Sequence, residues 1–176
     1  MQDGFSMLCR AAQDGDLERV RDLLNSGARV DKAPHKTPLM IASKNGHTEI
    51  VRLLLEHGAK VDRTSNDGNT PLVIASEEGH TEIVKLLLFR FAKVDKPDRD
   101  GLTPLQIANA EGHFEIFILL IEHGADLHKI KRLYSNLRGQ EAITANKLWR
   151  WPEAKLARSR YLRRRWRGLF LGTSFW

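Results

Sequence analysis

Apolar residues recur along the chain in a pattern that predicts pairs of short helices. The longer blocks, at 50–55, 83–88 and 116–120, place apolar side chains three and four residues apart. That spacing is the period of one face of a helix. A shorter apolar block precedes each of them, as at 39–42, with a glycine between the two. Each unit is therefore predicted to be a helix–turn–helix pair, which can bury its apolar faces only by stacking on neighbouring pairs.

The start of each short helix is marked by Thr-Pro-Leu, which occurs at 37–39, 70–72 and 103–105, and so at equal intervals. We expect the threonine hydroxyl to accept a hydrogen bond from an orphan helix N–H. The proline then occupies the first helical position, where its missing N–H costs nothing. Gln106 lies three residues after Thr103, which is the spacing of a capping box.

Two further motifs keep the same interval. Gly-His stands at 46–47, 79–80 and 112–113. The glycine is expected to end the short helix and the histidine to start the long one. Gly58 and Gly124 are predicted to end long helices in the left-handed conformation that glycine tolerates.

The period and the sequence Thr-Pro-Leu-x-x-Ala resemble the ankyrin repeat. The resemblance covers about residues 1–128, in four units. The units are roughly residues 1–31, 32–62, 63–95 and 96–128. The resemblance implies an all-α fold, a solenoid of stacked helix–turn–helix units with short β-hairpin loops, followed by a basic extension at 129–176. The first unit lacks Thr-Pro-Leu but keeps apolar helix positions, as expected of a capping repeat.

Two places depart from the pattern. Phe91 stands where other units have the helix-ending glycine, and a bulky residue at positive φ is strained. We therefore expect this turn to differ from the others or to be less stable, unless the ring packs on a neighbouring unit. Val30 to Thr37 spans seven residues, whereas 61–70 and 94–103 each span nine, so the first hairpin is predicted to be stunted.

Cysteine usage and apolar runs favour an intracellular protein. Cys9 is the only cysteine, so no intrachain disulfide can form and a reducing compartment is expected. Residues 1–16 lack the basic start and long apolar run of a secretory signal. The longest wholly apolar run, 116–121, is far too short for a membrane-spanning helix. The sequence thus predicts localisation in the cytoplasm, the nucleus or both.

The net charge of +6 is unevenly distributed. Residues 129–176 carry 13 Lys and Arg against two Asp and Glu, whereas residues 1–128 have a net charge of −5. A basic helix is predicted from 153 to 168. Its arginines are Arg158, Arg160, Arg163, Arg164, Arg165 and Arg167. Residues 129–150 are compatible with a degenerate cap, since an array needs its last apolar face covered.

Four interpretations of this basic tail stay open. It is compatible with a nuclear-import or nucleic-acid-binding arm, because arginines with interleaved aromatics neutralise phosphates and stack on bases. It is equally compatible with binding to an anionic membrane surface. Its charge also fits intramolecular docking on the acidic repeats. Finally, its unusual composition fits a product of alternative splicing or an altered reading frame, with no evolved role.

The residues offer little support for catalysis or for a bound metal or cofactor. His47, His80 and His113 recur once per unit, so neighbours should lie about 8–10 Å apart. Zinc needs its nitrogens at about 2.0–2.1 Å around one centre, so we interpret these histidines as turn residues. The sequence shows no glycine-rich phosphate loop, nucleophile elbow or metalloprotease motif. We therefore predict no catalytic residues, no metal, no cofactor and no enzymatic activity.

In the family that the chain resembles, partners usually bind the hairpin tips and the exposed face of each first helix, on the concave side. The resemblance implies that the chain is an adaptor or scaffold that binds another protein there. Carried onto this sequence, the predicted partner surface comprises Lys36, Lys44, Asn45, Asn66, Asp67, Asn69, Glu77, Glu78, Arg99, Asp100, Leu102, Ala110 and Glu111. Its later part is acidic, and the simpler interpretation of those charges is that they keep the protein soluble.

Overall fold

A computed structural model of the 176-residue chain describes residues 4–32 and 36–128. Contacts group Met1–Ala125 into one compact unit, which contains the helices α1 to α8. They are α1 (Gly4–Asp14), α2 (Leu17–Asn25), α3 (Pro38–Lys44), α4 (Thr48–Glu56), α5 (Pro71–Glu77), α6 (Thr81–Phe89), α7 (Pro104–Ala110) and α8 (Phe114–Glu122). The predictions for 129–176 lie outside the described residues.

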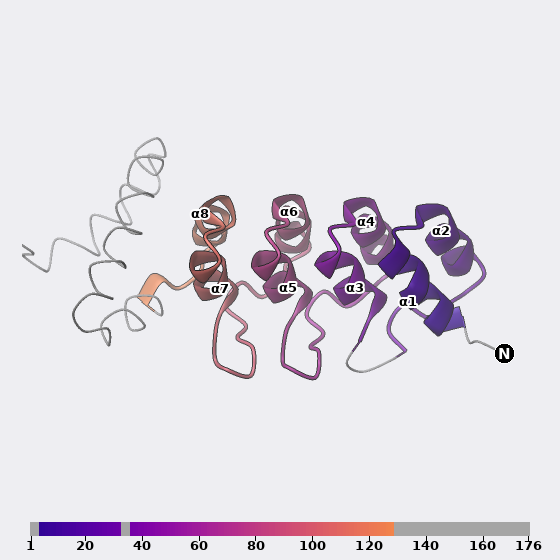
Figure 1. The fold of residues 1–176 in the computed structure, drawn as a ribbon, viewed down its shortest axis with the longest axis horizontal. Helices are drawn as coiled ribbons and strands as arrows, with labels where there is room; N and C mark the ends of the chain where they lie inside the picture. The colour runs from indigo at the N-terminus through magenta and orange to yellow at the C-terminus, as the bar shows by residue number, and fades with distance from the viewer. Residues whose placement is uncertain (1–3, 33–35, 129–176) are drawn as a thin grey trace, which may run out of the picture. The chain divides into compact units, whose positions relative to one another are not determined.

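The helices form consecutive antiparallel pairs, and the pairs stack side by side. The first helices of the units, α1, α3, α5 and α7, form one row, and α2, α4, α6 and α8 form a second row beside it (Figure 1). Each first helix packs on its own second helix and on the first helix of the next unit. The long loops that precede α5 and α7 project from the row of first helices (Figure 1). This arrangement confirms the predicted all-α solenoid; the described loops contain turns, and no strand is assigned within them.

The predicted caps of the first helices are present. The Oγ1 atoms of Thr37 and Thr70 accept hydrogen bonds from the N–H groups of Met40 and Val73, each at 3.2 Å. In the capping box of α7, Thr103 N donates to the side chain of Gln106 at 2.9 Å. These threonines are buried, so each cap satisfies a helix N–H that water does not reach.

The core runs through the stack between the two rows. The Thr-Pro-Leu leucines of the last three units are buried, as are leucines of the second helices that pack on them. This set comprises Leu39, Leu54, Leu72, Leu87, Leu105 and Leu120. Since each unit shares its core with both neighbours, the stability of a unit depends on the stack.

The histidines of the Gly-His motifs connect adjacent units. As predicted, they occupy the N-cap positions of α4, α6 and α8. Each Nε2–H also donates to a carbonyl at the C-terminal end of the preceding first helix. The pairs are His47 with Gln13 at 3.2 Å, His80 with Lys44 at 3.0 Å, and His113 with Glu77 at 2.9 Å. These bonds fix each first helix to the next unit.

A second set of bonds joins the loops that follow the second helices. The carboxylate of Asp31 accepts a hydrogen bond from Lys60 N, and that of Asp62 accepts one from Lys93 N, both at 2.9 Å. Arg63 Nε also lies 3.9 Å from Asp31 Oδ1. Neighbouring units are thus joined by hydrogen bonds at two places: the turn between the two helices of a unit, and the loop that follows its second helix.

The turn at Phe91 has a positive φ of 61°, and the turns at Gly58 and Gly124 also have a positive φ. Its hydrogen bonds match those of the glycine turns. Phe91 N and Ala92 N donate to α6 carbonyls at 3.0 Å each, and Gly58 N and Ala59 N make the equivalent bonds at 3.2 and 3.0 Å. The expectation that this turn differs is wrong, because the main-chain bonds keep their pattern whichever side chain is present. The ring does not pack on a neighbouring unit either, since it is 90% exposed.

Candidate partner surface

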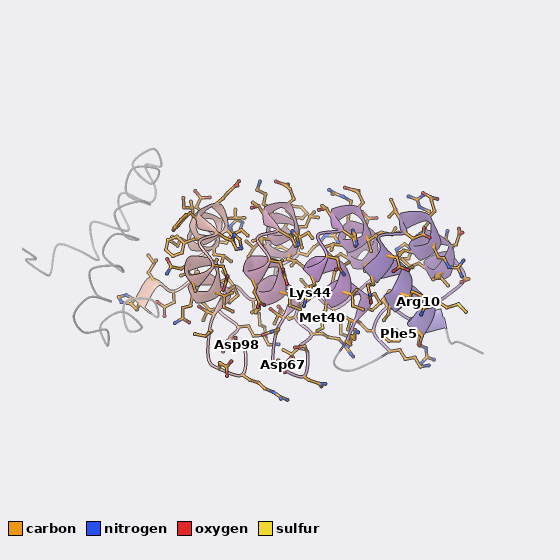
Figure 2. All side chains as sticks on the ribbon, viewed as in Figure 1. Phe5, Arg10, Met40, Lys44, Asp67 and Asp98 are labelled. Atoms are coloured by element: carbon orange, nitrogen blue, oxygen red, sulfur yellow. The ribbon has the colours of Figure 1, made fainter. Side chains whose placement is uncertain are left out.

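The residues of the predicted partner surface lie at the ends of α3, α5 and α7 and in the loops before them. Figure 2 shows Met40 and Lys44 in the row of first helices, and Asp67 and Asp98 on the loops that project from it. Eleven of the thirteen predicted residues are exposed, whereas Asn69 and Leu102 are half-buried. The structure therefore leaves the whole set accessible from the side of the first helices.

The loop before α5 is closed by its own hydrogen bonds. Ser65 N donates to Asn69 O at 2.9 Å. Ser65 Oγ accepts bonds from Asp67 N at 3.1 Å and Asn69 N at 3.2 Å. The Ser65 hydroxyl thus satisfies two backbone N–H groups of this tip. The side chain of Asp67 is exposed.

The loop before α7 uses a carboxylate for the same purpose. Asp98 N donates to Leu102 O at 3.0 Å, and Leu102 N donates to Asp98 Oδ1 at 2.8 Å. The two tips are joined by Arg99 N, which donates to Asp67 O at 3.1 Å. Sequence reasoning did not single out Asp98, which has this structural role beside the exposed Arg99 and Asp100.

The ends of the first helices have a fixed backbone and outward side chains. Asn45 Nδ2 donates to Ile41 O at 2.9 Å and so satisfies a carbonyl of the last turn of α3. Lys44 Nζ lies 4.0 Å from Glu78 Oε1, which joins units two and three across the surface. Of the predicted residues, Asn45 therefore has a structural role, whereas Lys44 and Glu78 present charge to solvent.

Several charges on the second helices pair within their own helix. The pairs are Glu18 with Arg21 at 2.8 Å, Glu49 with Arg52 at 3.4 Å, and Glu82 with Lys85 at 2.6 Å. The hydrogen bond from Lys85 to Glu82 raises the pKa of Lys85 above its ordinary value, and the charges of Glu82 and Glu115 add to this. By contrast, the carboxylates of Glu77 and Glu111 form no hydrogen bond or ion pair with the described residues.

The first unit extends this surface, which sequence reasoning missed. Phe5 and Arg10 of α1 lie in the same row as Met40 (Figure 2). Phe5 is half-buried and Arg10 is exposed. The missing Thr-Pro-Leu hid the register of this unit. The position of Gly15 reveals this register. A Cβ at Gly15 would lie 2.7 Å from the His47 ring, and a Cβ at Gly46 would lie at the same distance from the His80 ring.

Metal clusters and membrane-spanning helices were sought in the part of the chain that the structure describes. Among residues 4–32 and 36–128, no group of three or more His, Cys, Asp or Glu side chains is arranged to hold a metal ion. No described helix combines the length and apolar character needed to cross a membrane.

Helix pairs that repeat at a fixed interval and stack through a shared core define a helical-repeat solenoid. A family model of three ankyrin repeats matches residues 8–98, and a model of the single ankyrin repeat matches residues 100–132. The chain therefore belongs to the ankyrin-repeat family, whose members are generally protein–protein interaction modules. A comparison with curated proteins found no significant match.

Proposed function

We propose that the chain is a non-catalytic adaptor or scaffold, and that its partner protein binds the surface of hairpin tips and first-helix ends. One observation carries this proposal. Glu18, Glu49 and Glu82 of the second helices each pair with a base one turn away, whereas Glu77 and Glu111 of the partner surface have no such pair among the described residues. Unpaired exposed charge on one side is available to complementary charge on a partner.

The charges of this surface change sign along the stack. Arg10, Lys36 and Lys44 belong to units one and two. Units three and four contribute mainly acids, namely Asp67, Glu77, Glu78, Asp100 and Glu111. A partner that is basic where it faces units three and four would complement this pattern. Because units one and two are basic instead, the charges would also favour one orientation of the partner along the stack.

The backbone of this surface is well suited to binding. The tips are joined by the bond from Arg99 N to Asp67 O, and the helix ends by the bonds from His80 and His113 to the preceding unit. A surface that is already ordered loses little conformational entropy when a partner binds. The stack can therefore act as a rigid platform, with recognition performed by side chains.

The proposal includes an intracellular location, in the cytoplasm, the nucleus or both. Cys9 is the only cysteine of the chain. It supports this location, because a chain with one cysteine gains no internal disulfide from an oxidising compartment.

Proximity labelling of the full chain in cells tests the proposed function. The test variant is Glu77→Lys with Glu78→Lys, which reverses charge at the centre of the partner surface. The matched control is Glu49→Lys with Glu115→Lys, which makes the same charge change on exposed positions of α4 and α8. We expect a set of proteins labelled by the wild type and the control to be lost in the test variant. An identical labelled set for all three chains would contradict the proposal.

A further inference from the structure

Two phenylalanines at the end of α6 are exposed to an unusual degree. Phe89 is 75% and Phe91 is 90% exposed, and they are the large apolar side chains left exposed in the described part of the chain. Units two and four have glutamate and glycine at these positions, as in Glu56 and Gly58. The third unit thus has two aromatic rings where units two and four have a glutamate and a glycine.

Phe91 adopts this position at a conformational cost. Its φ of 61° lies in the left-handed region, which is strained for an aromatic residue. Because the ring is almost fully exposed, packing within the described residues does not offset the strain. A strained residue whose side chain stabilises nothing in its own fold indicates a function outside it.

The loops beside the two rings are basic. We call residues 26–32, 57–63 and 90–96, which follow α2, α4 and α6, the basic loop row; they contain seven Lys and Arg against three Asp. Bonds from Lys60 N to Asp31 and from Lys93 N to Asp62 hold these loops next to each other in the stack. Two of the three aspartates are therefore engaged with backbone N–H groups, while the side chains of Lys60 and Lys93 are exposed.

Besides the three loop aspartates, this region has acidic groups at the ends of the second helices. Glu56 and Glu122 occupy the positions equivalent to Phe89 in the neighbouring units. Arg90 lies between the two phenylalanines, and Lys93 follows Phe91 by two residues. The two phenylalanines are therefore adjacent in sequence to basic residues of the loop after α6.

We propose that this face docks on the surface of an anionic lipid bilayer, with Phe89 and Phe91 inserted at the interface and the basic loop row facing the headgroups. Both rings are three-quarters or more exposed, so both are accessible to a surface outside the chain. Exposed aromatic rings can insert into the interface of a bilayer, because lipids rearrange around them. Peptide ligands, by contrast, usually dock in a groove. Exposed lysines beside inserted apolar side chains add attraction to anionic lipids. The docking is separate from protein binding at the partner surface and extends the function proposed above.

Vesicle flotation with the full chain tests the aromatic contribution. The variant is Phe89→Glu with Phe91→Gly, which restores the residues of units two and four and relieves the strain at Phe91. It should melt no lower than the wild type, so a loss of binding is not a loss of folding. On phosphatidylserine–phosphatidylcholine vesicles we expect its apparent Kd to rise about tenfold or more, the effect of withdrawing a large apolar side chain from the interface.

A matched aromatic control is Phe114→Thr. Phe114 begins α8, at the opposite helix end from Phe89, and units two and three have threonine at this position (Thr48 and Thr81). This variant should bind the same vesicles as the wild type does.

The charge contribution has its own pair of variants. Lys60→Glu with Lys93→Glu should weaken binding to phosphatidylserine vesicles, whereas Lys36→Glu with Lys44→Glu, on the partner surface, should not. Because residues 129–176 are unchanged in every variant, their basic charge cannot produce a difference between the two pairs. All chains should bind pure phosphatidylcholine vesicles more weakly, since the headgroup charge is then absent.

Three results would overturn the proposal. The first is wild-type affinity of the Phe89→Glu, Phe91→Gly variant for anionic vesicles. The second is an equal loss in both charge-reversal pairs, which would mean that net charge alone drives binding. The third is a change in self-association without a change in vesicle binding, which would assign the rings to a second copy of the chain.

Discussion

The turn after α6 keeps the backbone of its glycine-containing counterparts although Phe91 occupies its central position. The repeat period places Phe91 opposite Gly58 and Gly124, but the sequence led to the wrong expectation that a phenylalanine turn would differ from theirs. The sequence was also not sufficient to predict where the ring lies, since a phenylalanine fits both a packed and an exposed position. The exposure of the ring shows that it does not pack in the core.

Replacing Phe91 by glycine should stabilise the protein. Relief of the left-handed strain is worth about 1–2 kcal/mol, and the greater freedom of glycine in the unfolded chain offsets part of it, which leaves up to about 1 kcal/mol. Urea unfolding of the full chain measures the difference. Phe91→Ala removes the ring but keeps the strain, so it should give no comparable gain. A loss of about 3–5 kcal/mol for Phe91→Gly would mean that the ring is a core residue.

Two buried serines give a second test at this scale. Ser43 and Ser76 occupy equivalent positions of α3 and α5, and their Oγ atoms have no hydrogen-bond partner among the described residues. An unpaired buried hydroxyl costs about 1–3 kcal/mol, and alanine is a better helix former. Ser43→Ala and Ser76→Ala should therefore each raise the unfolding free energy by about 1 kcal/mol, as measured by urea unfolding.

Ser65→Ala is the matched control for this prediction. Ser65 Oγ accepts bonds from Asp67 N and Asn69 N in the loop before α5. Its removal should therefore destabilise the protein by about 1 kcal/mol. If all three serine variants had the same effect, the hydrogen bonding described for them would be wrong.

At the level of elements, the Gly-His motif shows what the sequence conveys and what it omits. Its period located the end of each first helix and the start of each second helix. It did not reveal the bond from His80 Nε2 to Lys44 O, because a period identifies equivalent residues but not the unit that a side chain reaches. The same bond places the His80 ring against the turn glycine of the preceding unit. A Cβ at Gly46 would lie only 2.7 Å from that ring.

Two glycine substitutions separate backbone strain from this contact. Gly46 and Gly58 have φ of 75° and 81°. Alanine therefore costs about 1 kcal/mol in either turn. A Cβ at Gly58 meets nothing within 4 Å, whereas one at Gly46 must displace the His80 ring and its bond to unit two. Gly46→Ala should lower the melting temperature clearly more than Gly58→Ala does. Equal losses would show that the histidine contact contributes little.

At the level of the whole molecule, the constant repeat interval was enough to predict a solenoid of four units, because helix pairs with apolar faces have few ways to bury them. The part of the partner surface in unit one could not be assigned from sequence, because Thr-Pro-Leu is missing there. The packing of α1 on α3, and of Gly15 on His47, places Phe5 and Arg10 in the register of the other units. The difference between paired and unpaired acids likewise needed side-chain distances.

The stack should fold without the basic tail. Each described unit is bonded to its neighbours, and contacts group Met1–Ala125 into one compact unit. Residues 1–128 alone are therefore expected to give a helical circular dichroism spectrum and a cooperative melt. A disordered spectrum would instead make residues 129–150 an obligatory cap and move the domain boundary beyond them.

The most direct test of the central claim is the affinity of the full chain for a partner identified by proximity labelling, measured by calorimetry. Glu77→Lys with Glu78→Lys should weaken binding at least tenfold, or about 1.4 kcal/mol, because it places positive charge against the basic side of the partner. Glu49→Lys with Glu115→Lys should leave the affinity at the wild-type value. Equal affinities for both variants, or an equal loss in both, would contradict binding through the hairpin tips and first helices.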